Sequence, residues 1–157
     1  MASTRGVQLT PDGKERLESE LRSLKQEKLP ELSERIQNAN EEGDVTDNSE
    51  YEDLKDEYMH AEGRIREIEY ILEHAILIEE GSLDGTIGLG SHLTVDTDDG
   101  EPLEEWILVS AEEADSLNGR ISDESPVGKE LIGKKAGDTF IVETMDGNVT
   151  YKVVDVK

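Results

Sequence analysis

The feature that most constrains this fold is an apolar pattern with heptad spacing between residues 51 and 75. Apolar or small residues recur there at alternating steps of three and four, at Tyr51, Leu54, Tyr58, Ala61, Ile65, Ile68, Leu72 and Ala75. This spacing places one seam of side chains along a single helix face, and the seam needs a partner helix to cover it. The pattern therefore predicts a long helix that pairs with another one.

A second, less regular helical pattern precedes this seam and can supply the partner. Its apolar residues share one face in two groups, Leu17, Leu21 and Leu24, and then Leu32, Ile36 and Ala39. Thr10 is expected as the N-cap and Pro11 as the first helical residue. Pro30 predicts a local irregularity, because proline removes a helical hydrogen bond and clashes with the preceding turn. Two such helices predict an antiparallel coiled coil about 45 Å long, at ~1.5 Å per residue.

The periodicity changes to two after residue 80. "SHLTVDT" and "LEEWILVS" predict two strands around an Asp-Asp-Gly turn, and "DTFIVETMDGNVTYKVVDV" predicts a hairpin that turns at Asp146-Gly147. Between them, "SPVGKELIGKKAGD" predicts a short helix that begins at Ser125-Pro126 and ends at Gly133. We therefore expect an α+β protein with two domains. Residues 1–80 form the coiled coil, and residues 81–157 form a compact antiparallel sheet with one short helix.

The stretch between the two helical patterns, "EEGDVTDNSEYEDL" from Glu41, contains seven acidic residues and no basic one. Two interpretations stay open. Gly43 can end the first helix, and Asp47 with Glu50 has the spacing of a capping box, so the turn can be purely structural. Alternatively, Asp44 and Asp47 can direct their carboxylates at one Mg²⁺, which needs only one or two protein carboxylates. The isolated protein would hold the ion weakly, and a partner would have to supply further ligands.

The net charge of −23 over 157 residues restricts the choice of partner. It argues against binding bare nucleic acid through a broad basic surface, because phosphate neutralisation needs clustered Lys and Arg. It suits a basic protein partner, metal ions or a cell with high internal salt, and also plain solvated surface charge. The absence of cysteine excludes disulfides and thiolate metal sites. "MASTRGVQLT" contains no apolar segment of signal-peptide or membrane-span length, so a soluble cytoplasmic protein is expected.

Several motifs, taken in order, resemble the bacterial Gre transcript-cleavage factors. "EEGDVTDNSEYEDLKDE", "EGRIREIEYILEHA" and "ISDESPVGKELIGKKAGD" carry the resemblance, which extends from "LTPDGKERLESEL" to "YKVVDV". It implies an N-terminal antiparallel coiled coil and a C-terminal domain of FKBP-like fold. The C-terminal domain would dock at the rim of the secondary channel of bacterial RNA polymerase. The loop that resembles the docking element of this family contains Asp123, Ser125 and Pro126.

The same resemblance implies an accessory factor rather than an enzyme. The coiled coil would enter the channel, where Asp44 and Asp47 would help to hold a Mg²⁺ shared with the polymerase. The polymerase itself would hydrolyse the backtracked transcript. The implied partners are RNA polymerase and, indirectly, the 3′ end of the nascent RNA. We expect a monomer that does not associate with membranes. The resemblance also implies a role in transcription and DNA binding.

Two departures from the family pattern support a second hypothesis, namely that the protein inhibits the polymerase instead of stimulating cleavage. The usual second tip acid of the family is glutamate, and Asp47 is shorter by one methylene. A carboxylate that stops about 1 Å short can cost on the order of a hundredfold in rate. Asn40 stands where the cleavage factors tend to carry a basic residue, and Lys55 is the only basic residue between residues 36 and 63. The C-terminal half also resembles Gre homologues that occupy the same channel and inhibit the polymerase.

A third hypothesis follows from the FKBP-like fold alone, namely a prolyl isomerase. Trp106, Phe140 and Tyr151 are the only aromatic residues after residue 80, which argues against an aromatic-lined proline pocket. The three histidines, at positions 60, 74 and 92, match no catalytic triad or metal cluster. A free-standing enzyme is therefore disfavoured.

Overall fold

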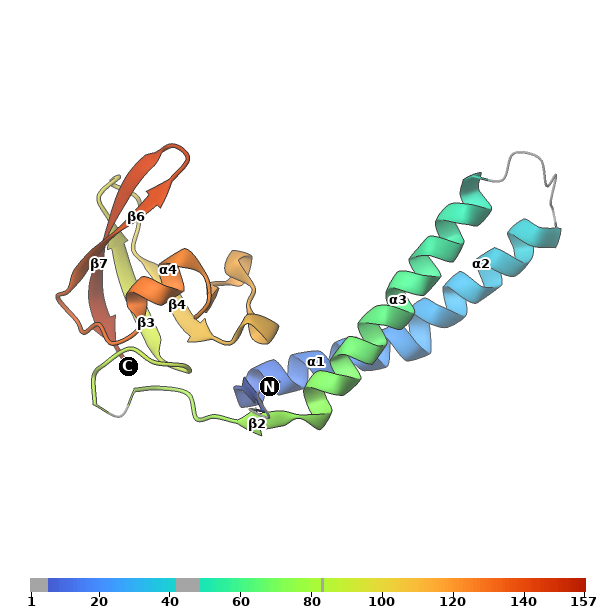
Figure 1. The fold of residues 1–157 in the computed structure, drawn as a ribbon, viewed down its shortest axis with the longest axis horizontal. Helices are drawn as coiled ribbons and strands as arrows, with labels where there is room; N and C mark the ends of the chain where they lie inside the picture. Colours follow the sequence, from blue (N-terminus) through green and yellow to red (C-terminus); the bar gives the residue numbers. More distant parts are fainter. Residues whose placement is uncertain (1–5, 42–48, 83) are drawn as a thin grey trace, which may run out of the picture. The chain divides into compact units, whose positions relative to one another are not determined.

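The computed structural model describes residues 6–41, 49–82 and 84–157 (Figure 1). Chain contacts divide the described residues into two units. The coiled-coil unit comprises residues 14–74, and the sheet unit comprises residues 6–13 together with residues 75–157. The N-terminal segment joins the sheet unit because β1 (Val7–Leu9) pairs in parallel with β2 (Ala75–Leu77). The predicted division at residue 80 assigned that segment to the coiled coil.

The coiled-coil unit is a helical hairpin. Helix α1 spans Pro11–Ser23, so its first turn belongs to the sheet unit, and it is followed by α2 (Leu29–Glu41) and α3 (Ser49–Glu73). Figure 1 shows α2 beside α3, running in the opposite direction. Between α2 and α3 one buried cluster contains Leu32, Leu54 and Ala61, flanked by the partly buried Leu24, Leu29, Ile36, Ala39 and Tyr58. Leu17, Ile65, Ile68 and Ile71 are also buried in this unit. The predicted pairing of two apolar seams is confirmed.

The predicted irregularity near Pro30 is a π-helical turn at Leu24–Lys28. Because Pro30 has no N–H and its ring crowds the carbonyl four residues earlier, a regular helix cannot continue through this point. The backbone widens instead, and the Leu29 N–H donates to the Leu24 carbonyl five residues back. The helix thereby continues into α2 without losing its apolar face.

The buried face at the C-terminal end of α3 differs from the prediction by one residue. Ile71 is only 4% exposed, whereas Leu72, the predicted seam residue, is half-buried. A heptad repeat drifts on an α-helix by about 20° per heptad, but this drift favours the residue after the seam position, so it does not account for the burial of Ile71.

The main sheet of the sheet unit has the strand order β5-β4-β3-β7-β6. Its strands are β3 (His92–Thr97), β4 (Glu104–Val109), β5 (Arg120–Ser122), β6 (Thr139–Thr144) and β7 (Gly147–Val156). Both predicted hairpins are confirmed, and all neighbours are antiparallel except β4 and β5, which pair in parallel. The short strand β5 was not predicted.

Helix α4 (Pro126–Leu131) lies against one face of this sheet (Figure 1). Its Leu131 joins seven other buried residues in one core, namely Ile87, Leu93, Val95, Leu108, Phe140, Val142 and Val153. The α+β class, with a helical hairpin and a curled sheet domain that carries one short helix, is therefore confirmed. Within the described parts of the chain, no helix has the length and apolar character needed to cross a membrane.

Candidate functional site

The predicted tip residues Asp44 and Asp47 lie outside the described residues, as do Gly43 and Asn48. Their roles as Mg²⁺ ligands or helix caps therefore stay predictions. On the two sides of this stretch, α2 ends at Glu41 and α3 begins at Ser49. Glu50 and Glu52 lie in the first turn of α3. Negative side chains are stabilised at a helix N-terminus, so these two glutamates have a structural reason for their position.

The other predicted site residues, Asp123, Ser125 and Pro126, lie together in the turn between β5 and α4. Ser125 is the N-cap of α4, since its Oγ accepts the Gly128 N–H at 3.0 Å. The same hydroxyl donates to the Ser122 carbonyl at 2.7 Å. Pro126 occupies the first helical position, where a missing N–H costs nothing. The predicted helix start is confirmed. Residues 122–126 are called the Ser122–Pro126 loop below.

Backbone hydrogen bonds hold this loop at both ends. The Asp123 N–H donates to the Val109 carbonyl at 2.9 Å, and the Ser125 N–H donates to the Ser122 carbonyl at 3.1 Å. The Ser122 Oγ accepts the Glu124 N–H at 3.0 Å. With its main chain fixed in this way, the loop presents a half-buried Asp123 side chain and an exposed Glu124 side chain.

Gly128 is the residue that lets α4 approach the loop so closely. A Cβ at this position would lie 1.8 Å from the Ser122 carbonyl oxygen and 3.0 Å from the Asp123 Cα. Both neighbours are backbone atoms, which cannot move aside as a flexible side chain could. Gly128 is therefore required for this loop conformation, although the sequence alone gave it no structural role.

A groove of about 410 Å³ lies beside the loop within the sheet unit. Asp123, Glu124 and Glu112 contribute carboxylates to its lining, and Ile76 and Leu89 contribute apolar surface. Ile76 is 51% exposed although it is a large apolar residue. Carboxylates around exposed apolar surface complement a partner segment that combines basic and apolar side chains.

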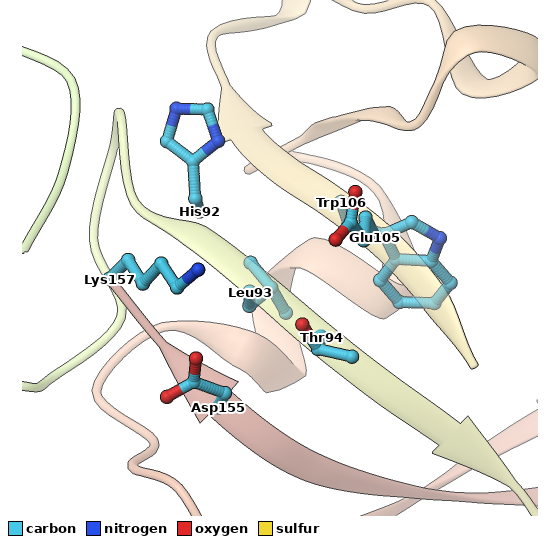
Figure 2. Close-up of a pocket in the computed structure, with 7 residues that line it drawn as sticks. All are labelled: His92, Leu93, Thr94, Glu105, Trp106, Asp155 and Lys157. Atoms are coloured by element: carbon cyan, nitrogen blue, oxygen red, sulfur yellow. The ribbon is translucent and has the colours of Figure 1, made fainter.

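A second, smaller cavity of about 230 Å³ lies on the sheet where β3, β4 and β7 run side by side (Figure 2). Figure 2 shows that charged and polar side chains surround it, including His92, Glu105, Asp155 and Lys157, and that Trp106 is its one aromatic residue. A pocket for a prolyl ring needs mostly apolar walls. This lining gives no support to the isomerase hypothesis.

A buried polar network at the start of α1 was not predicted. Glu113 accepts the Thr10 backbone N–H at 2.9 Å and also the Thr10 hydroxyl proton, while the Thr10 hydroxyl oxygen accepts the Gly13 N–H at 3.0 Å. Arg120 donates from Nη1 to Glu113 at 2.7 Å and from Nη2 to Asp12. Burial lowers the pKa of Arg120, but a guanidinium is so basic that it stays charged. One sequence signal was available, because Gly13 is a poor residue for a helical turn.

The histidines lie in ordinary structural surroundings. Nδ1 of His60 and Nδ1 of His74 each lie within 2.8 Å of the backbone carbonyl four residues earlier. His92 Nε2 lies 3.0 Å from a carboxylate oxygen of Glu80. In residues 6–41, 49–82 and 84–157, no group of three or more His, Asp or Glu side chains is arranged to hold a metal ion.

Comparison with known proteins covers almost the whole chain. The family description "Transcription elongation factor, N-terminal" matches residues 7–76, and "Transcription elongation factor, GreA/GreB, C-term" matches residues 82–157. Transcription elongation factor GreA of Roseiflexus sp. (strain RS-1) is 42% identical over 158 residues, which is 99% of each chain. GreA of Syntrophomonas wolfei is also 42% identical, over 100% of this chain and 99% of the relative. Among solved structures, GreA factor homolog 1 (Gfh1) of Thermus thermophilus is 36% identical, covering 98% of this chain and 99% of that one, with a TM-score of 0.46.

Proposed function

The chain belongs to the GreA/GreB family of transcription elongation factors, and from this premise we propose that it binds RNA polymerase and assists cleavage of backtracked transcripts. The observation that carries the proposal is the extent of the match. The two family descriptions include both the acidic stretch after Glu41 and the Ser122–Pro126 loop. This match supports the assignment of one part of the chain to docking and another to chemistry.

Docking is assigned to the Ser122–Pro126 loop and the adjacent groove. The hydrogen bonds of Ser122 and Ser125 hold the loop in one conformation before any partner arrives, which lowers the entropy cost of binding. Asp123 contributes to the lining of the groove, beside the exposed apolar side chain of Ile76. The expected partner surface is a basic and apolar segment at the rim of the secondary channel.

Chemistry is assigned to Asp44 and Asp47. Carboxylate oxygens are ligands that Mg²⁺ prefers, and the ion accepts one or two of them while other ligands come from elsewhere. When bound, a second metal ion in such a site stabilises the attacking water and the leaving oxygen. The two aspartates would supply negative charge at the end of the hairpin, and the polymerase would supply the remaining ligands and the reaction. The factor would act in the cytoplasm as a monomer and contact the RNA 3′ end only indirectly.

The test is transcript cleavage by stalled elongation complexes of the cognate polymerase. The proposal predicts that added protein shortens the backtracked RNA from its 3′ end, and that chelation of Mg²⁺ abolishes this effect. The same protein should bind the polymerase in a competition assay against a labelled Gre factor. Binding with no change in cleavage would remove the cleavage assignment and leave only channel occupancy.

Inhibition of the polymerase is the second candidate, and two sequence observations favour it. The family resemblance implies a glutamate where this chain has the shorter Asp47, and a basic residue where it has Asn40. Asp47→Glu separates the two functions. If reach limits a cleavage factor, the longer acid should raise the cleavage rate, by up to about a hundredfold. An inhibitor would instead keep blocking the channel with either residue.

A further inference from the structure

We propose that Glu113 and Arg120 are positioning residues, which fix the start of α1 to the strand that leads into the Ser122–Pro126 loop. This inference rests on the proposed function and adds to it. The proposed function assigns docking to the Ser122–Pro126 loop and chemistry to the tip, so α1, the start of the helical hairpin, needs a fixed attachment to the strand that carries this loop. Glu113, Arg120 and their contacts all lie within the sheet unit.

Glu113 contacts the start of α1 directly. Its side chain is 2% exposed, and its carboxylate accepts both the backbone N–H and the hydroxyl proton of Thr10, the N-cap of α1. The Thr10 hydroxyl passes this support on, because its oxygen accepts the Gly13 N–H at 3.0 Å. A negative charge at a helix N-terminus is also favoured by the helix dipole. Glu113 therefore holds α1 by its first turn.

Gly13 lies very close to the Glu113 carboxylate. A Cβ on Gly13 would lie 2.1 Å from Cδ of Glu113 and 2.5 Å from both of its carboxylate oxygens. Glycine weakens a helical turn, so a glycine there needs a reason in the surroundings. The reason here is that the carboxylate occupies the space that any other side chain would take.

Arg120 links this helix anchor to the Ser122–Pro126 loop. Arg120 binds Glu113 and Asp12 at once, so its guanidinium joins the 3₁₀ turn Ala111–Glu113 to the first turn of α1. Arg120 is also the first residue of β5, whose last residue is Ser122. A strand of three residues is about 7 Å long from its first Cα to its last, at ~3.3 Å per residue. The helix anchor and the docking loop therefore share one short, hydrogen-bonded strand.

A buried ion pair is by itself weak support for any role beyond folding, because apolar replacements of such pairs are often as stable. The test must therefore separate positioning from stability. Glu113→Gln removes the charge and keeps the shape, and Thr10→Val removes the hydroxyl relay. Thr10→Ser keeps that relay and serves as the conservative variant. Val142→Ala, in the core of the same unit and away from the network, serves as a control that lowers the melting temperature only.

The first measurement is amide hydrogen exchange in the full-length protein, which involves no polymerase. Exchange at Thr10 and Gly13 should become about tenfold faster or more in Glu113→Gln. Thr10→Val should have this effect at Gly13, whose N–H loses its acceptor, whereas Thr10→Ser should match the unsubstituted protein. The amides of β3 and β7 should be unaffected in all three. Unchanged exchange at Thr10 and Gly13 in Glu113→Gln would overturn the proposed anchor.

The second measurement compares polymerase affinity with transcript cleavage at saturating protein. Glu113→Gln and Thr10→Val should bind within about twofold of the unsubstituted protein and should cleave roughly tenfold to a hundredfold more slowly at saturation. Thr10→Ser and Val142→Ala should retain both properties. The positioning role alone would be overturned if Glu113→Gln cleaved at the full rate. It would also be overturned if Val142→Ala, with the same melting temperature as Glu113→Gln, lost as much cleavage activity. If the unsubstituted protein has no effect on cleavage, the proposed function fails first, and this inference fails with it.

Discussion

The coiled-coil unit and the sheet unit are stabilised by different means. The charged contacts of the coiled-coil unit lie at the surface, and its buried apolar residues are spread along the helices, namely Leu17, Leu32, Leu54, Ala61, Ile65, Ile68 and Ile71. The sheet unit buries eight apolar residues in one core and also encloses a charged pair, Glu113 and Arg120. The hairpin therefore depends on a single seam, whereas the sheet domain has a core that can support fixed loops.

This difference fits the proposed assignment of docking to the sheet unit and chemistry to the hairpin. A long two-helix hairpin exposes most of its surface, so it has a small core for its length. A domain with a full core can instead hold a loop such as Ser122–Pro126 in one conformation. We therefore expect seam substitutions to act on the hairpin alone, and loop substitutions to act on binding.

The largest expected effect comes from emptying the seam. Leu32 is completely buried, and Leu32→Ala should destabilise the hairpin by about 2–5 kcal/mol, because a large buried side chain is lost and a cavity remains. Leu131→Ala, equally buried in the sheet core, is the matched variant. Hydrogen exchange should increase throughout residues 14–74 in the first variant and across β3 and β7 in the second. Simultaneous loss of protection in both units in either variant would contradict the independence of the two cores.

The next effect concerns the docking loop and uses the same substitution in both units. Gly128→Ala places a methyl group 1.8 Å from the Ser122 carbonyl, so the loop must move, and polymerase affinity should fall by about tenfold or more. In Gly63→Ala the new Cβ would meet nothing closer than 4.0 Å, the end of the Arg66 side chain. Glycine costs about 0.5–1 kcal/mol in a helix interior, so this variant should stabilise the hairpin by that amount. Equal affinities of the two variants in a competition assay would contradict the docking assignment.

The sequence predicted those elements whose signals are local. The heptad spacing predicted α3, alternation predicted β3, β4, β6 and β7, and the pairs Thr10-Pro11 and Ser125-Pro126 predicted two helix starts. Each of these signals relates residues that are close to one another in the sequence. The loop that contains Asp123 was singled out by the family resemblance, and the local Ser125-Pro126 signal marked only its end.

The elements that the sequence did not predict depend on contacts between distant residues. Strands β1, β2 and β5 have three residues each, too few for a period to be recognised, and their partners are far away or parallel. The Glu113 network joins residues that are 103 positions apart in the chain. No local pattern could show that one glutamate of a strongly acidic chain is buried while its neighbour Glu112 is exposed.

The smallest expected effect is that of the surface charges of the hairpin. Arg64 forms two hydrogen bonds with Glu20, at 2.7 and 3.0 Å, and hydrogen bonding to that carboxylate raises the pKa of Arg64. Its side chain is 35% exposed, so solvent screens the pair, and a double-mutant cycle with Arg64→Gln and Glu20→Gln should give about 0.5–1 kcal/mol. The more exposed pair Lys25 and Glu69 is the control, with an expected coupling of about 0–0.5 kcal/mol. A larger coupling for the control would show that exposure does not decide the strength of these pairs.

The most direct test of the central claim, that docking and chemistry belong to separate parts of the chain, is transcript cleavage by Asp44→Asn with affinity measured in parallel. The amide keeps the shape of the side chain but loses the charge that attracts a divalent cation. The account predicts that cleavage at saturating protein is abolished, while polymerase affinity and melting temperature stay close to those of the unsubstituted protein. Undiminished cleavage together with a sharply lower melting temperature would contradict it, because Asp44 would then be a structural cap.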